Sequence, residues 1–218
     1  MEAAKREIFI TGWMVTPFFV LVRPNSLDSE YRLDKVLQRC AERGVTVNII
    51  VFQEPKVALN NDSEYTKRYF ESLHKNIKVM RHPKYILVPF IWSHHEKLVV
   101  IDQKVGFLGG LDLCYGRMDN HHHQLTDTNE PFIWEGADYA NLRISDIYTP
   151  RQYQTSMTDR AKVPRMPWHD IAVQIRGESV IDLVRHFVQY WNFVNFQNKL
   201  NDRELLIQAG IAPSEEMV

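Results

Sequence analysis

The sequence predicts an α/β fold with a mixed β-sheet that has helices on both faces. Short β-branched runs typical of buried strands alternate along the chain with segments in which apolar residues recur at helical spacing. This alternation indicates a sheet covered by helices. With 218 residues and an apolar fraction of 44%, the chain is large enough to build a real core in one domain or a tightly joined pair.

The first part of the chain contains three predicted strands and two predicted helices. The strands are the apolar runs at residues 7–12, 45–51 and 77–80. The helices cover residues 32–43 and 63–75. Gly44 directly follows the first helix, at a position where a helix end favours glycine. Candidate N-caps of the second helix are Asn61, Asp62 and Ser63.

The second part of the chain adds three strands and one long helix. The strands are predicted at residues 95–101, 105–108 and 171–175. The helix at residues 178–196 carries a recurring apolar face. Residues 116–168 are polar and rich in prolines, aromatics and charges, so we expect mostly loop there, with short helical pieces.

Composition limits the class of protein. The 26 basic and 27 acidic residues give a formal charge of -1, which argues against a nucleic-acid partner. Two cysteines are too few for a disulfide framework and fit a reducing compartment. The apolar stretch at residues 8–22 lacks a basic leader and is too short to span a bilayer. We therefore expect a cytoplasmic protein that reaches any membrane substrate peripherally.

The segment with the most chemical information contains His95 and Lys97. On a strand these two side chains lie on the same face, about 7 Å apart along the strand. An imidazole acts as a nucleophile or proton donor, and an ammonium neutralises phosphate oxygens, so the pair suits a phosphoryl group. We expect Lys97 to lie in an exposed pocket and to contribute little to the core. Asp102 has the opposite parity, which predicts a role in supporting the strand end.

The extended motif resembles that of the phospholipase D superfamily. It reads His95-x-Lys97-x-x-x-x-Asp102, followed by Gly109-Gly110-Leu111-Asp112. The surrounding sequence is similar to the first catalytic half of eukaryotic phosphatidylcholine-hydrolysing phospholipases D. The segments that carry this likeness are residues 63–68, 76–83, 111–117 and 164–170. The resemblance extends to about Phe196.

The resemblance implies a phospholipase D that converts phosphatidylcholine to phosphatidic acid and choline through a phosphohistidine. It implies a catalytic set of His95, Lys97 and Asp102. It implies substrate-binding positions at Gly109, Gly110 and Asp112, where the glycines let the backbone approach the phosphate closely. We expect no metal and no cofactor, a phospholipid membrane surface as partner, and no nucleic acid. The run of histidines at residues 121–123 is interpreted as a polar loop.

The family site needs two such motifs, and this sequence contains one. We interpret residues 1–200 as a catalytic half with its motif at residues 95–112, and residues 201–218 as a tail or the start of a missing second half. A second copy of the chain is the other way to complete the site. Two alternative functions stay open, a homodimeric nuclease-like phosphodiesterase and a catalytically inactive regulatory module.

Overall fold

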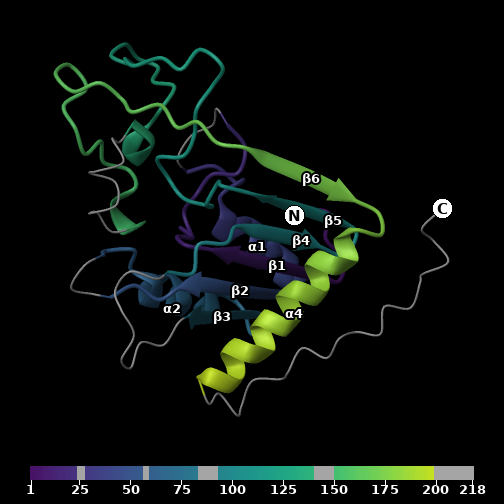
Figure 1. Cartoon of the computed structure of the whole chain (residues 1–218). Helices are drawn as coiled ribbons and strands as arrows, with labels where there is room; N and C mark the ends of the chain where they lie inside the picture. The colour runs from purple at the N-terminus through teal and green to yellow at the C-terminus, as the bar shows by residue number, and fades with distance from the viewer. Residues whose placement is uncertain (24–27, 56–58, 83–92, 140–149, 199–218) are drawn as a thin grey trace.

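One mixed sheet organises the molecule. The computed structural model describes residues 1–23, 28–55, 59–82, 93–139 and 150–198. Within these residues six strands lie in the order β3-β2-β1-β4-β5-β6 (Figure 1). Their bounds are β1 Glu7–Gly12, β2 Thr46–Phe52, β3 Ile77–His82, β4 Leu98–Ile101, β5 Val105–Gly109 and β6 Ala172–Arg176. Strands β1, β2 and β3 pair in parallel, whereas β4, β5 and β6 join antiparallel, which confirms the predicted mixed sheet.

Helices cover both faces of the sheet, as predicted (Figure 1). Helices α1 (Leu33–Glu42) and α2 (Ser63–Leu73) pack on one face, and α4 (Val180–Gln197) crosses the other. Side-chain alternation in β1 explains the two layers. Ile8 and Ile10 join the core under α1, whereas Phe9 stacks on Phe187 of α4 at 4.5 Å between ring centroids.

The ends of α1 and α2 are stabilised in different ways. Gly44 has a φ of +94° and donates its N–H to Ala41 O at 2.9 Å, as expected of a glycine after a helix. At α2, Asp62 occupies the N-cap position, but its side chain makes no capping hydrogen bond. The Ser63 N–H instead donates to Glu54 Oε1 at 3.1 Å. A carboxylate from the loop after β2 therefore satisfies this helix terminus.

Strand β4 begins three residues later than the sequence predicted, at Leu98 instead of His95. The β1–β4 ladder ends at the pair Thr11 and Leu98, because the chain turns away after β1. The next backbone N–H groups, of Trp13 and Met14, donate to Asp112 Oδ1 at 2.8 and 3.3 Å. The motif residues before Leu98 therefore have no strand partner and are held by side chains.

The described parts of the segment between β5 and β6, residues 110–139 and 150–171, are mostly loop with two short 3₁₀ helices, η1 (Gly136–Tyr139) and η2 (Pro150–Gln152), as expected. They have a small core of their own around the fully buried Trp134. The buried Arg165 guanidinium lies 3.6 Å from the centre of the Trp134 ring. Arg160 pairs with Asp127 at 3.1 Å. Aromatic rings and paired arginines thus stabilise this segment in place of an aliphatic core.

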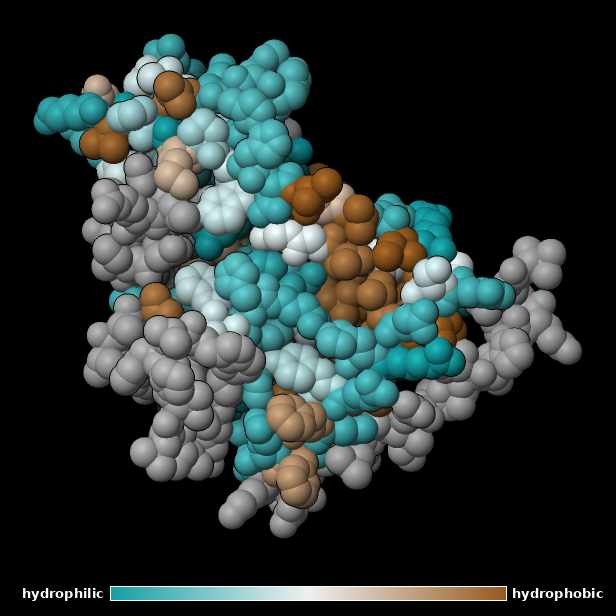
Figure 2. Space-filling view, in the orientation of Figure 1, coloured by the Kyte–Doolittle hydropathy of each residue, from teal (hydrophilic) through white to brown (hydrophobic). Residues whose placement is uncertain are grey.

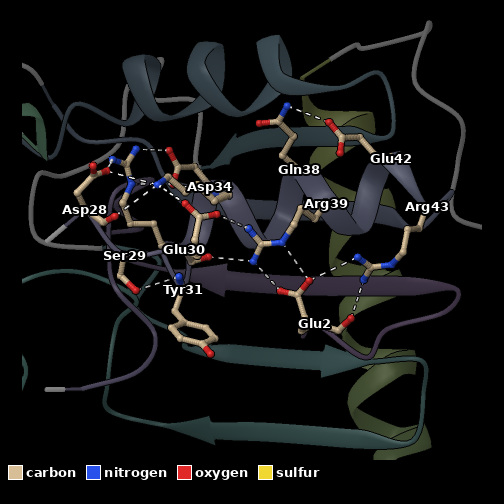
Figure 3. A network of polar contacts seen from close by, with 12 residues as sticks. Glu2, Asp28, Ser29, Glu30, Tyr31, Asp34, Gln38, Arg39, Glu42 and Arg43 are labelled. Carbon is tan, nitrogen blue, oxygen red and sulfur yellow. Dashed lines mark hydrogen bonds and ion pairs between the residues drawn. The ribbon is translucent and has the colours of Figure 1, made fainter. Parts of the chain in front are cut away.

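A surface network ties the N-terminal segment to α1 (Figure 3). Glu2 accepts from Arg39 at 2.9 Å and Arg43 at 3.4 Å, and Arg39 also reaches Glu30 at 3.3 Å. Exposed pairs of this kind contribute about 0–1 kcal/mol each. Their joint effect is to fix the chain just before β1.

The edge of the sheet at β6 is only partly covered. Exposed apolar side chains gather where β5 and β6 extend past α4 (Figure 2). Ile171 and Val173 are 77% and 47% exposed. Residues 199–218, which include the predicted tail at 201–218, lie outside the described residues.

Candidate active site

His95 and Lys97 lie in an irregular segment, residues 93–97, just before β4. The His95 side chain is exposed, whereas Lys97 is only 7% exposed. The expectation of an exposed-pocket lysine was therefore wrong. The Lys97 ammonium is held by two short contacts, a hydrogen bond to the His95 carbonyl oxygen at 2.8 Å and an ion pair with Asp112 Oδ2 at 3.1 Å.

Asp112 connects the two ends of this site. It is 4% exposed, and its Oδ2 faces Lys97 while its Oδ1 accepts the N–H groups of Trp13 and Met14. A buried carboxylate with this many donors is fully compensated. The structure thus brings three predicted site residues together, His95, Lys97 and Asp112.

Two N–H groups of the Lys97 ammonium are used by Asp112 and the His95 carbonyl. An ammonium carries three donors, so one is left without a partner among the described residues. The other two contacts hold the Lys97 ammonium in place, so the position of this third N–H group is fixed as well. Such a donor is suited to an anionic oxygen bound beside His95.

Electrostatics keep the His95 imidazole neutral. Partial burial lowers its pKa most, and the charges of Lys97 and Arg117 lower it further. The carboxylates of Asp112 and Asp170 act in the opposite direction but do not reverse the shift. The lowered pKa favours the neutral ring near pH 7, and the neutral ring keeps a lone pair available for attack on an electrophile.

Asp102 lies at the far end of β4 from His95. Its carboxylate accepts three backbone N–H groups, from Lys5 at 2.9 Å, Arg6 at 2.8 Å and Glu7 at 3.0 Å. These contacts fix the entry into β1, and they agree with the strand-end role that side-chain parity predicted. Its assignment to the catalytic set stays a prediction.

Gly109 and Gly110 lie where β5 meets the beginning of β6. A Cβ on Gly109 would collide with the Ile171 carbonyl oxygen and lie 2.7 Å from Ala172 Cα. A Cβ on Gly110 would collide with the Asp170 carboxylate. The absent side chains therefore permit a close approach of the protein's own chain, with Asp170 in van der Waals contact with Gly110. A direct role of the glycines toward phosphate stays a prediction.

Gly110→Val is expected to be destructive. The new side chain must displace the Asp170 carboxylate, whose exposed side chain can turn away, so we expect a larger effect on the surroundings of His95 than on the free energy of unfolding. Because Asp170 raises the pKa of His95, its displacement should also lower that pKa further. Chemical denaturation and NMR titration of the His95 ring measure both effects. Lys162→Ala is the control, because that lysine side chain is 81% exposed. An unchanged stability and unchanged His95 pKa in Gly110→Val would contradict the placement of Asp170.

Sequence reasoning missed Asp170 and Arg117 as site residues. Asp170 accepts a hydrogen bond from Trp168 Nε1 at 3.1 Å, and the Arg117 guanidinium lies 4.2 Å from the centre of the Trp168 ring. Both border a pocket of about 260 Å³ beside the motif. The available signal was positional, since Asp170 directly precedes a predicted strand and so lies at a sheet edge.

Two residues of the histidine run line the same pocket. His121 and His123 border it, and His123 Nδ1 lies 2.8 Å from Asp119 Oδ2. Among the residues that the structure describes, no cluster of three or more His, Cys, Asp or Glu side chains is arranged to hold a metal ion. Across those same ranges, every helix falls short of the length or the hydropathy that a bilayer span requires.

Comparisons with known proteins agree with this motif. The family model described as Phospholipase D matches residues 1–213. Phospholipase D zeta 2 of Arabidopsis thaliana is 39% identical over 100% of this chain and 21% of its own length. Phospholipase D2 of Bos taurus is 42% identical over 87% of this chain and 23% of its own length, and Phospholipase D1 of Saccharomyces cerevisiae is 40% identical over 88% and 12%.

The chain thus spans less than a quarter of the length of these curated relatives. Among solved structures, Nuc from Salmonella typhimurium, a phospholipase D family member, aligns with a TM-score of 0.45 at 13% identity, covering 88% of this chain and 81% of that one. The family match covers nearly the whole chain, and the relatives are well above 30% identical over most of it. This chain belongs to the phospholipase D family.

Proposed function

We propose that this chain supplies one phosphate-binding half of a phospholipase D active site, which hydrolyses phosphatidylcholine to phosphatidic acid and choline. The observation that supports it best is the Lys97 ammonium, fixed beside an accessible, neutral His95 with one donor left over. The choice of phosphatidylcholine rests on the likeness of the sequence around the motif to eukaryotic enzymes that act on it.

In the proposed reaction, the neutral His95 ring donates its lone pair to phosphorus, and a nitrogen–phosphorus bond forms. The bond from phosphorus to the choline oxygen breaks, and the histidine of a second motif gives that oxygen a proton. Water then attacks phosphorus, the bond to His95 breaks, and the second histidine takes the proton from water. The Lys97 ammonium offsets the negative charge that builds on the phosphate oxygens in both steps.

The remaining predicted residues act through others in this proposal. Asp112 positions Lys97 and the turn after β1. Asp102 positions the entry into β1. Gly109 and Gly110 leave room for Ile171 and Asp170 beside the motif.

A second motif must complete the site, because the sequence holds a single His-x-Lys-x-x-x-x-Asp. Residues 1–200 form one catalytic half in this proposal, and the second comes from another catalytic half or from a second copy of the chain. In a symmetric dimer the two His95 rings would face each other across the axis. The phospholipid would be reached peripherally at the membrane surface.

His95→Ala is expected to reduce choline release from phosphatidylcholine vesicles by at least about a thousandfold, because it removes the attacking nitrogen. The assay compares the purified wild-type chain with this variant over a range of chain concentrations. A rate per chain that rises with concentration would identify a second copy as the missing half. His122→Gln, which changes an exposed histidine that does not line the pocket, is the matched control.

Choline release that persists in His95→Ala would refute the assignment of the nucleophile. A wild-type chain that is inactive at every concentration would instead call for titration with inorganic phosphate, followed by NMR of the His95 ring. The half-site proposal then requires a shift of that resonance in the wild-type chain and its loss in Lys97→Met. An absence of any shift in the wild-type chain would overturn it.

A further inference from the structure

The irregular segment at residues 93–97 is held from the side of α4. His94 Nδ1 lies 2.9 Å from Tyr190 Oη, and Glu96 Oε2 lies 2.6 Å from His186 Nε2. The other oxygen of Glu96 accepts a hydrogen bond from Thr11 Oγ1 at 3.0 Å. His95 and Lys97 alternate with these residues and contact other elements: the His95 ring lies 6.0 Å from the Trp13 ring, and Lys97 pairs with Asp112 at 3.1 Å. His94 and Glu96, the residues on either side of His95 in the sequence, are thus both held by side-chain contacts.

The spacing of the two contacts matches the geometry of both elements. His186 and Tyr190 are four residues apart on α4, a rise of about 6 Å along the helix. His94 and Glu96 are two residues apart, a separation of about 6.6 Å in a fully extended chain. The two partners therefore meet with little distortion of either backbone. A single pair would leave the segment free to rotate about one point, whereas two pairs fix its direction.

The pair of His94 and Tyr190 lies in a buried environment that keeps both side chains uncharged. His94 is 6% exposed, and burial lowers its pKa to about 3. Burial also raises the pKa of the Tyr190 hydroxyl, with a further contribution from Glu96. The His94 ring also lies 6.5 Å from the His82 ring, which meets Tyr190 edge-on at 5.3 Å. Near pH 7 the contact is therefore a hydrogen bond between neutral groups and does not depend on ionic screening.

We propose that α4 positions the active-site histidine, with Tyr190 and His186 as the two positioning residues. They orient His94 and Glu96 toward the helix, and side-chain alternation then directs His95 and Lys97 toward other elements. The inference rests on the proposed function for the role of His95 in catalysis. Its structural part, the control of the His95 environment by α4, is independent of which substrate is bound.

The test uses Tyr190→Phe, His186→Gln and the double variant, with Gln189→Ala at an exposed position of α4 as control. NMR titration of the His95 ring is the first readout. Loosening the segment exposes the ring to water, so the lowered His95 pKa should rise toward its ordinary value in the double variant. Titration with inorganic phosphate is the second readout, with an expected loss of affinity of about 10- to 100-fold.

The conservative exchange Glu96→Gln distinguishes positioning from general stability. In Glu96→Gln the amide still reaches His186 and Thr11. Apart from the effect of the lost negative charge, the His95 pKa should therefore stay close to its wild-type value. Glu96→Ala, in contrast, should behave like His186→Gln. A His95 pKa unchanged in the double variant, in a chain whose spectrum remains folded, would overturn the proposal. This holds even if phosphate fails to bind the wild-type chain, an outcome that counts against the proposed function alone.

Discussion

Lys97→Ala is expected to destabilise the fold by about 3–5 kcal/mol, in addition to removing the charge that we propose binds phosphate. The truncation leaves the Asp112 carboxylate buried and deprives it of its only cationic contact among the described residues. Removing one partner of a buried ion pair lowers the free energy of unfolding by more than the intact pair contributes, because the remaining charge stays buried away from water without a counter-charge. Urea denaturation followed by tryptophan fluorescence measures the loss.

A double variant separates the cost of the stranded charge from other effects of the substitution. Lys97→Met with Asp112→Asn removes both charges, keeps an amide oxygen for the Trp13 and Met14 N–H groups, and should recover most of the stability. Lys162→Ala is the matched control, because that lysine side chain is 81% exposed. Equal stability of Lys97→Ala and the wild-type chain would mean that the Lys97–Asp112 pair is not buried.

Acidification from pH 7 to pH 5 is expected to cost about 2 kcal/mol of stability for each of two buried histidines. Burial lowers the pKa of His82 to about 4 and that of His94 to about 3. In the unfolded chain both titrate near their ordinary value of about 6.5. Between these values the unfolded state binds more protons, so stability is complete above about pH 6.5 and falls as the pH drops toward 4 and 3.

Urea denaturation at pH 7, 6 and 5 measures this slope. His82→Gln and His94→Gln should each be less stable than wild type at pH 7 but lose less on acidification, because one titrating group is gone. His121→Gln should keep the wild-type slope, since that ring is exposed. A slope that is the same in all four proteins would show that the buried rings are not the source of acid sensitivity.

The strands and helices were predictable because each carries a strong periodic signal. Helix α4 begins two residues after, and ends one residue after, the predicted bounds of residues 178 and 196. The late start of β4 was not predictable, because it depends on where the chain after β1 turns away. That turn is stabilised by Asp112, a residue remote in sequence from Trp13.

The candidate site was predictable where residue spacing alone fixes geometry. His95 and Lys97 are two residues apart, so their proximity follows from the sequence even though β4 begins only at Leu98, and the structure also brings Asp112 to Lys97. The burial of Lys97 and the closeness of Asp170 were not predictable from local sequence. The burial of Lys97 involves its contact with Asp112, and the position of Asp170 depends on pairing between β5 and β6, which are separated in the sequence by residues 110–171.

The same pairing has a consequence for the order of assembly. The hairpin of β4 and β5 closes over a short turn, whereas β5 can pair with β6 only after the whole of residues 110–171 has been synthesised and brought back. Closing so long a loop carries a larger entropic cost and is slower. On a ribosome, Lys97 and Asp112 therefore emerge together, and Asp170 reaches them only later. At that stage of synthesis, His95 already has Lys97 beside it but does not yet have the Asp170 carboxylate.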